Sequence, residues 1–346
     1  MDSDYFGFHL FFDNILIINF YIRQKINMKR ITYLILLIFM SGTVLVAQER
    51  YLEPITEDIQ TETQTYVSKD GQNLDLDIYY PEYDSETERA TLIYVHGGGF
   101  QQGTRNSEDI QKFCTELARY GYVVASISYR LTRKDKPGGF GCDCPVTEKL
   151  NTFYAAVEDL QDASFFLIQH REEFGINPQK IILAGSSAGA ETVLNTAYQP
   201  PYCYGLESGP VAFAGVIGMA GAIPDTTVIY DESAIPSLLF HGTADQLVPY
   251  GTAPHHYCKK GSPGYMILDG SKTIAIKLEK LGVPCWLHTT CGAGHEMATV
   301  PMTKYFDDIV NFCYHYVVKK DGETRYTVVE GDKITDDNQP LNSCTE

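Results

Sequence analysis

The sequence predicts one α/β domain, built on a mostly parallel sheet with helices on both faces. Short apolar runs alternate with helical patterns along most of the chain, and this alternation is typical of strand–helix–strand units. Glycine-rich turns at 96–100 and 185–189 each follow an apolar run directly. Ligands of such sheets bind beyond the carboxyl ends of the strands, so both turns fall where a functional site is expected.

The elements are predicted in a regular order. A β segment over 64–80, with a turn at 69–72, opens the domain. The elements that follow are strand 91–95, helix 107–120, strand 122–128, helix 147–171, strand 180–184, helix 188–198, strand 211–219, strand 236–241, helix 271–281, strand 284–290 and helix 303–317. Long loops over 131–146 and 250–270 leave the carboxyl ends of strands, so we expect them to wall a pocket.

Segments of different character flank this domain, which we place at 65–318. Residues 28–47 combine a basic start, an apolar run and a cleavage position after Ala47, as a signal peptide does. Residues 1–27 are interpreted as an over-extended start ahead of the true first residue, Met28; a membrane anchor spanning both segments is the alternative. Two polar segments complete the chain: 48–64, and a tail at 319–346 that we expect to be loose.

Charge and cysteine content narrow the setting in which the protein works. A formal net charge of −17 in 346 residues argues against nucleic acid or an anionic membrane surface as a partner. The signal peptide predicts a secreted or periplasmic protein, without stable membrane insertion once the signal is cleaved. Export permits disulfides among the nine cysteines. Cys114 and Cys313 fit core thiols, and the pairing of those in or beside loops stays open (Cys142, Cys144, Cys203, Cys258, Cys285 and Cys291).

The turn at 185–189 reads Gly-Ser-Ser-Ala-Gly between a predicted strand and a predicted helix. In a Gly-x-Ser-x-Gly turn the central serine is forced onto a sharp bend, where its hydroxyl stands clear of the sheet. The flanking glycines are needed because side chains there would collide with neighbouring backbone. Ser187 is therefore the candidate nucleophile.

The turn at 96–100 reads His-Gly-Gly-Gly-Phe and follows strand 91–95. Acyl transfer builds negative charge on the substrate carbonyl oxygen, and backbone N–H groups aimed at that oxygen stabilise it. A strand followed by His-Gly-Gly-Gly is the form that this loop takes in lipases and esterases. We name the N–H groups of Gly98, Gly99 and Ala188 as the oxyanion donors. An ordinary glycine-rich turn is the alternative, and a dinucleotide site is disfavoured because no Gly-x-Gly-x-x-Gly opens a helix here.

These two motifs, with the order of strands between them, resemble the α/β-hydrolase esterases, and among these the hormone-sensitive-lipase and carbohydrate-esterase-like groups. The likeness covers about residues 65–318 and includes Ser128-Tyr129-Arg130-Leu131 and Phe174-Gly175-Ile176-Asn177-Pro178. The resemblance implies the α/β-hydrolase fold. It also implies a serine carboxylic ester hydrolase whose nucleophile, acid and base follow in that order along the chain.

The acid and the base are sought beyond the nucleophile. Asp245 lies in the loop after strand 236–241, where the family supplies its acid, although an Asx turn would also explain it. Asp225, after the preceding strand, is the competing acid. His295 follows the last strand before the final helix, where the family carries its base. His96 is expected to brace the glycine loop, and the other histidines weighed as bases are His255, His256 and His288.

The sequence thus predicts a secreted serine carboxylesterase that works through an acyl-enzyme. Its substrates are expected to be small acyl esters or carbohydrates, polysaccharides included, that carry acetyl or feruloyl groups. No metal-ligand spacing stands out, and no cofactor is expected. Three alternatives stay open: a peptidase of the prolyl-oligopeptidase type, a lipase, and a non-catalytic hydrolase-fold binding module.

Overall fold

The computed structural model describes residues 20–30, 49–199, 211–330, 333–335 and Cys344. Two compact units make up the chain, Met1–Gln48 and Glu49–Glu346. In the first unit residues 20–30 form a helix; most of the predicted signal peptide and of the segment before it lies outside the described residues. Of the helices in the described ranges, none combines the length and apolar character that a membrane span needs.

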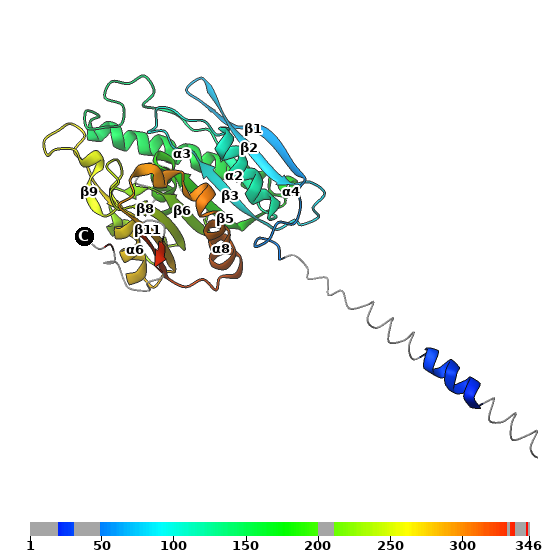
Figure 1. Cartoon of the computed structure of the whole chain (residues 1–346). Helices are drawn as coiled ribbons and strands as arrows, with labels where there is room; N and C mark the ends of the chain where they lie inside the picture. Colours follow the sequence, from blue (N-terminus) through cyan, green and yellow to red (C-terminus); the bar gives the residue numbers. More distant parts are fainter. Residues whose placement is uncertain (1–19, 31–48, 200–210, 331–332, 336–343, 345–346) are drawn as a thin grey trace, which may run out of the picture. The chain divides into compact units, whose positions relative to one another are not determined.

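The second unit is built on one large sheet, in which the described residues form ten strands (Figure 1). Their order across the sheet is β1-β2-β4-β3-β5-β6-β8-β11-β12-β13. From β4 to β12 in this order all neighbours pair in parallel, whereas β1–β2, β2–β4 and β12–β13 are antiparallel. The strands are β1 (Ile59–Lys69), β2 (Gln72–Pro81), β3 (Arg89–Val95), β4 (Val123–Ile127), β5 (Ile176–Ser186), β6 (Gly215–Met219), β8 (Ser237–Gly242), β11 (Cys285–Cys291), β12 (Arg325–Glu330) and β13 (Lys333–Thr335). The mostly parallel sheet predicted from the sequence is confirmed.

Helices cover both faces of this sheet, as expected. They are α2 (Glu108–Arg119), α3 (Val146–Gln169), α4 (Arg171–Phe174), α5 (Ala188–Tyr198), α6 (Ser271–Lys280), α7 (Pro301–Lys304), α8 (Phe306–Phe312) and the π-helical η5 (Cys313–Lys319). Strand β3 is buried along its whole length, because alternate side chains enter different hydrophobic clusters. Ile93 and Val95 pack in the cluster that contains side chains of α3, α5 and α6. Leu92 and Tyr94 pack in the cluster that contains side chains of α2 and α8.

A small second sheet joins the segment that follows β6 to the loop region that follows β8. It contains β7 (Ala222–Ile223), β10 (Ile267–Gly270) and β9 (Thr252–Pro254). The predicted loop 250–270 therefore has regular structure of its own, since β9 and β10 pair antiparallel within it.

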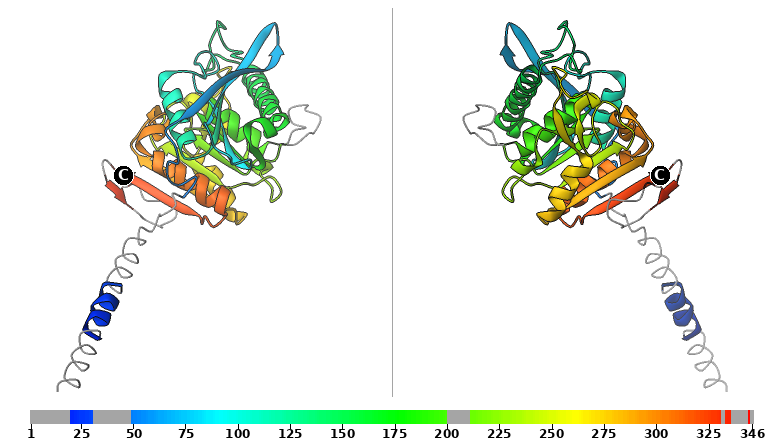
Figure 2. Two further views of the ribbon diagram at one scale, coloured as in Figure 1. Left: turned by 90° about the vertical axis from the view of Figure 1, so that its right-hand side faces the viewer. Right: turned by 90° about the vertical axis from the view of Figure 1, so that its left-hand side faces the viewer.

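The C-terminal segment differs from its prediction as a loose polar tail over 319–346. β12 pairs in parallel with β11, and Figure 2 shows it at the end of the sheet opposite the blue β1–β2 hairpin. Its residues Tyr326, Val328 and Val329 are buried, and a disulfide joins Cys344 to β11. The apolar run of this strand is short and lies among charged residues, so its stability comes mainly from the partner strand.

Other element boundaries in the structure also differ from those predicted from the sequence. β1 begins at Ile59, inside the segment 48–64 that the sequence predicts to precede the domain, and the Glu49–Glu346 unit includes that whole stretch apart from its first residue. The predicted helix 303–317 is interrupted and becomes α7, α8 and η5. Among the cysteines, Cys114 and Cys313 are buried free thiols as expected, and so are Cys144 and Cys285.

Candidate active site

The bend at Ser187 joins the end of β5 to the start of α5. Ser187 adopts φ 52° and ψ −122°, a conformation that few residues other than glycine take up. A Cβ on Gly189 would lie 2.0 Å from the carbonyl oxygen of Val95, and one on Gly185 would lie 2.3 Å from that of Gly189. The two glycines are therefore required by backbone packing, as the sequence motif implied, and the bend holds the Ser187 side chain at the carboxyl end of the sheet.

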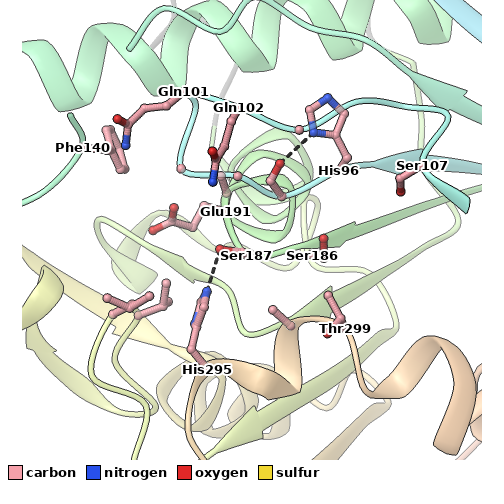
Figure 3. Close-up of a pocket in the computed structure, with 18 of the residues that line it drawn as sticks. His96, Gln101, Gln102, Ser107, Phe140, Ser186, Ser187, Glu191, His295 and Thr299 are labelled. Carbon is pink, nitrogen blue, oxygen red and sulfur yellow. Dashed lines mark hydrogen bonds between the residues drawn. The ribbon is translucent and has the colours of Figure 1, made fainter. Parts of the chain in front are cut away.

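Three side chains from separate loops meet at this bend, and Figure 3 shows two of them, Ser187 and His295. Oγ of Ser187 lies 2.7 Å from Nε2 of His295, and Nδ1 of His295 lies 2.7 Å from Oδ2 of Asp245. An ionised carboxylate can only accept, so Nδ1–H of His295 donates to Asp245 and Nε2 is free to accept from the Ser187 hydroxyl. The structure thus brings together the nucleophile, base and acid named from the sequence.

Asp245 is fully buried and is positioned by its own loop. Its Oδ1 accepts hydrogen bonds from the backbone N–H groups of Leu247 at 2.8 Å and Val248 at 3.0 Å. Asp245 therefore forms the Asx turn that was the alternative explanation for this residue, and its other oxygen contacts His295. Burial raises the pKa of Asp245, but hydrogen bonds from His241 and His295 outweigh this and bring the pKa well below its ordinary value.

His241 is a supporting residue that the sequence did not single out. It is the penultimate residue of β8 and is fully buried, with Nε2 3.1 Å from the carbonyl oxygen of Val248 and 3.5 Å from Oδ2 of Asp245. Because a carbonyl only accepts, Nε2–H of His241 donates, and Nδ1 accepts from the Ser271 hydroxyl at 2.8 Å. These hydrogen bonds link β8 to the start of α6 and to the loop that carries Asp245, and so hold that loop in place.

The glycine loop after β3 lies beside Ser187 and lines the same cavity. Gly98 and Gly99 have φ +118° and +61°, and the N–H groups of Gln101 and Gln102 both donate to the carbonyl oxygen of Gly98. Among the described residues, none accepts a hydrogen bond from the N–H of Gly98 or Gly99. Ala188 begins α5, where first-turn N–H groups have no partner within the helix. These three donors are available to an oxygen bound near Ser187.

The other candidates from the sequence have different surroundings. Asp225 caps a short 3₁₀ turn by accepting from the N–H of Thr227. His288 is buried in β11, and burial lowers its pKa to about 4. His96 contacts the glycine loop as expected, since its Nδ1–H donates to the carbonyl oxygen of Gly97 at 2.7 Å and its ring packs on Tyr129.

A cavity of about 590 Å³ opens over Ser187. Phe140 from the loop 131–146, and His255 and His256 from the loop 250–270, line it, so the expectation that these loops wall the pocket is confirmed. Figure 3 shows Gln101, Gln102, Phe140 and Glu191 on one side of Ser187, and Ser107 and Thr299 on the other. Within the described ranges no group of three or more metal-binding side chains is found.

Glu191 is a second cavity residue that the sequence did not single out. It lies on α5 one turn beyond Ser187 and is only 2% exposed. Burial raises the pKa of its carboxyl, and the nearby Lys149 lowers it in part. His255, whose pKa burial lowers well below its ordinary value, faces this carboxyl with Nε2 3.3 Å from Oε1. The sequence carried no signal for this contact because its partners lie far apart along the chain.

Comparison with known proteins identifies relatives among esterases. The BD-FAE family model matches residues 76–201. An acetyl esterase from Salmonella paratyphi B is 32% identical over 121 residues, which are 35% of this chain and 31% of that protein. An ethyl acetate hydrolase from Pseudomonas putida is 29% identical over 134 residues, which are 38% of this chain and 36% of that protein. The matches therefore span about a third of the length of these curated relatives.

Solved structures of esterases share the fold over most of the chain. Esterase 2 of Thermogutta terrifontis, with propionate bound, has a TM-score of 0.54 and 21% identity, covering 75% of this chain and 94% of that chain. Brefeldin A esterase, described as a bacterial homologue of human hormone-sensitive lipase, has a TM-score of 0.52 and 18% identity over 78% of this chain and 80% of that one. The α/β-hydrolase fold and the resemblance to esterases inferred from the sequence are thereby confirmed.

Proposed function

We propose that this α/β-hydrolase-fold protein is a serine carboxylesterase. The observation that carries the proposal is the continuous hydrogen-bonded series from Ser187 through His295 to Asp245, at the floor of a cavity large enough for a small ester. Geometry of this kind activates a serine hydroxyl, because the imidazole accepts the proton as the oxygen attacks and the carboxylate stabilises the imidazolium that forms.

The reaction proceeds in two halves. Ser187 Oγ attacks the ester carbonyl while His295 takes its proton, and the N–H groups of Gly98, Gly99 and Ala188 stabilise the resulting oxyanion. His295 then gives the proton to the leaving alcohol, so that an acyl-enzyme forms. Water, deprotonated by His295, attacks the acyl-enzyme in the second half and releases the acid.

The substrates proposed are small acyl esters, with acetylated or feruloylated carbohydrates as the natural class. The similarity to an acetyl esterase and an ethyl acetate hydrolase supports a short acyl group. A panel of 4-nitrophenyl esters with acetyl, butyryl and decanoyl groups, together with methyl ferulate, tests this. We expect the acetyl and butyryl esters to have the highest kcat/KM. Preference for the decanoyl ester would favour the lipase alternative, and no turnover of any ester would refute the proposal.

Export from the cytoplasm is proposed as well. The basic and apolar character of residues 28–47 supports it, and so do the disulfides Cys142–Cys258 and Cys291–Cys344, which persist in oxidising compartments. N-terminal sequencing of the protein from the periplasm or the medium should give a start near Gln48. Recovery of an uncleaved chain in the cytoplasm, with its thiols reduced, would contradict this.

A further inference from the structure

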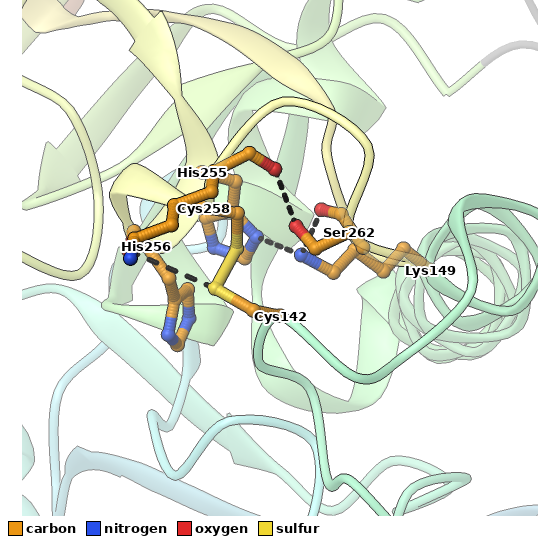
Figure 4. Close-up of a disulfide and its surroundings, with 8 residues drawn as sticks. Cys142, Lys149, His255, His256, Cys258 and Ser262 are labelled. Atoms are coloured by element: carbon orange, nitrogen blue, oxygen red, sulfur yellow. Dashed lines mark hydrogen bonds between the residues drawn. A yellow bond between two sulfur atoms is a disulfide. The ribbon is translucent and has the colours of Figure 1, made fainter.

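A second set of buried polar residues reaches the cavity that Ser187 and His295 line. Nζ of Lys149, on α3, donates to Nδ1 of His255 at 3.1 Å and to the carbonyl oxygen of Gly264 at 3.0 Å (Figure 4). Nε2 of His255 lies 3.3 Å from Oε1 of Glu191. Lys149, His255 and Glu191 are 0%, 1% and 2% exposed, so this Lys149–His255–Glu191 chain is almost wholly buried, and His255 and Glu191 are its members that line the cavity.

The loops that carry this chain are cross-linked. The disulfide Cys142–Cys258 joins the segment just before α3 to the segment just after His255. Beside it, the N–H of Gly264 donates to the carbonyl oxygen of Cys142 at 2.8 Å. A Cβ on Gly264 would lie between 2.6 and 2.9 Å from three carbonyl oxygens of the neighbouring loop, so only glycine allows this close approach. His255 is thereby held against Glu191.

Charge balance alone does not explain the position of Glu191. A buried ammonium such as that of Lys149 needs an acidic group nearby, and Glu191 meets that need through the imidazole. Yet the carboxyl lines the substrate cavity one helical turn from Ser187, and Figure 3 shows it beside the nucleophile. Among the described residues none makes an aligned hydrogen bond to its Oε1. Oε1 is itself shielded from solvent, so a substrate hydroxyl pairs with the carboxyl only when the side chain turns toward the cavity. A buried acceptor without a donor is costly, and such a pairing removes that cost.

We propose that Glu191 is a specificity-determining residue that hydrogen-bonds a hydroxyl group next to the scissile ester. The site then favours monoesters of polyols and sugars over esters of simple alcohols. A hydroxyl both donates and accepts, so it pairs with the carboxyl in either protonation state. Gln101 and Gln102 lie on the same side of Ser187 as Glu191 and add two amide groups there, next to the ring of Phe140. This inference rests on the proposed esterase function and names the chemistry of its alcohol.

The test compares two acetate esters that differ by one hydroxyl, cyclohexyl acetate and trans-2-hydroxycyclohexyl acetate. For the wild-type protein we expect kcat/KM for the hydroxylated ester to be at least tenfold higher. Glu191→Leu should lower this ratio about 10- to 100-fold, the effect of losing a hydrogen bond to a charged or buried partner. Glu191→Gln should keep the ratio within about fivefold, because an amide also pairs with a hydroxyl. Asp109→Asn, which neutralises an exposed carboxylate elsewhere on the cavity, should leave the ratio unchanged.

Use of a ratio separates specificity from folding, because a loss of folded protein lowers both rates equally. If Glu191→Leu does not fold, the double variant Lys149→Met/Glu191→Leu removes both ionisable groups together and replaces them by apolar side chains, a change that buried pairs tolerate better. A ratio near one in the wild type, or an unchanged ratio in either Leu variant, would overturn the inference. Failure of the wild type to hydrolyse 4-nitrophenyl acetate would instead refute the esterase function itself.

Discussion

Replacement of Gly98 by alanine tests the oxyanion loop. The new Cβ would lie 2.0 Å from the carbonyl oxygen of Gln102 and 2.7 Å from its carbonyl carbon, far inside contact distance. Gly98 also has φ +118°, a region that alanine rarely adopts. The turn from Gly98 to Gln102 must therefore open, and the N–H donors move away from the oxyanion. Loss of one such donor costs about 2.7–4 kcal/mol, so we expect kcat to fall by about 10²–10³.

Gly99→Ala is the matched control. At φ +61° a Cβ on Gly99 meets only the flexible Gln101 amide at 3.4 Å, so the cost is limited to about 1–2 kcal/mol of left-handed strain. We expect kcat to stay within about tenfold of wild type. The assay is hydrolysis of 4-nitrophenyl acetate, with thermal unfolding to show that both variants fold. If Gly98→Ala kept wild-type kcat at unchanged stability, this loop would be a simple turn without a role in catalysis.

The remaining predictions concern the disulfide, the acid and metal independence. Cys142→Ser/Cys258→Ser should lower the free energy of unfolding by about 2–4 kcal/mol and raise KM, because the bridge joins both loops over the cavity; urea unfolding and steady-state kinetics measure these. Asp245→Asn should lower kcat about 10⁴-fold at pH 7. The pKa of Asp245 is depressed in the folded state, so the ionised carboxylate stabilises the fold above the unfolded-state pKa of about 3.9, and this stabilisation is lost as the pH falls. The difference in free energy of unfolding between wild type and Asp245→Asn should therefore shrink by about 1 kcal/mol from pH 6 to pH 3. Excess chelator should leave ester turnover unchanged, since Ser187 and His295 supply the nucleophile and the base; a loss restored by a divalent metal would contradict this.

The positions of Ser187, Asp245 and His295 could be read from the sequence because backbone geometry restricts each of them. The bend at Ser187 needs glycine on both sides, and that requirement appears as a local motif. Asp245 and His295 each follow a parallel strand, β8 or β11, and the carboxyl ends of parallel strands meet at one edge of the sheet. The order of nucleophile, acid and base along the chain then assigns Asp245 as the acid and His295 as the base.

The Lys149–His255–Glu191 chain could not be read in this way. Lys149 lies on a long helix, where a lysine normally faces water, and its burial depends on a loop more than a hundred residues later. The disulfide pairings have the same origin, because they depend on which loops meet in space. β12 was missed for a related reason: its few apolar residues become a strand only beside β11.

The central claim is that Ser187 is the nucleophile of an ester hydrolase, and covalent labelling tests it most directly. An organophosphonate that attacks activated serines should inactivate the protein, with mass spectrometry placing one adduct on Ser187. Ser187→Ala should take up no label and lose at least 10³-fold in kcat. Ser186→Ala, which removes the neighbouring hydroxyl in the same cavity, should still be labelled on Ser187 and should keep a kcat close to wild type. Label on another serine, or turnover by Ser187→Ala close to wild type, would contradict the assignment.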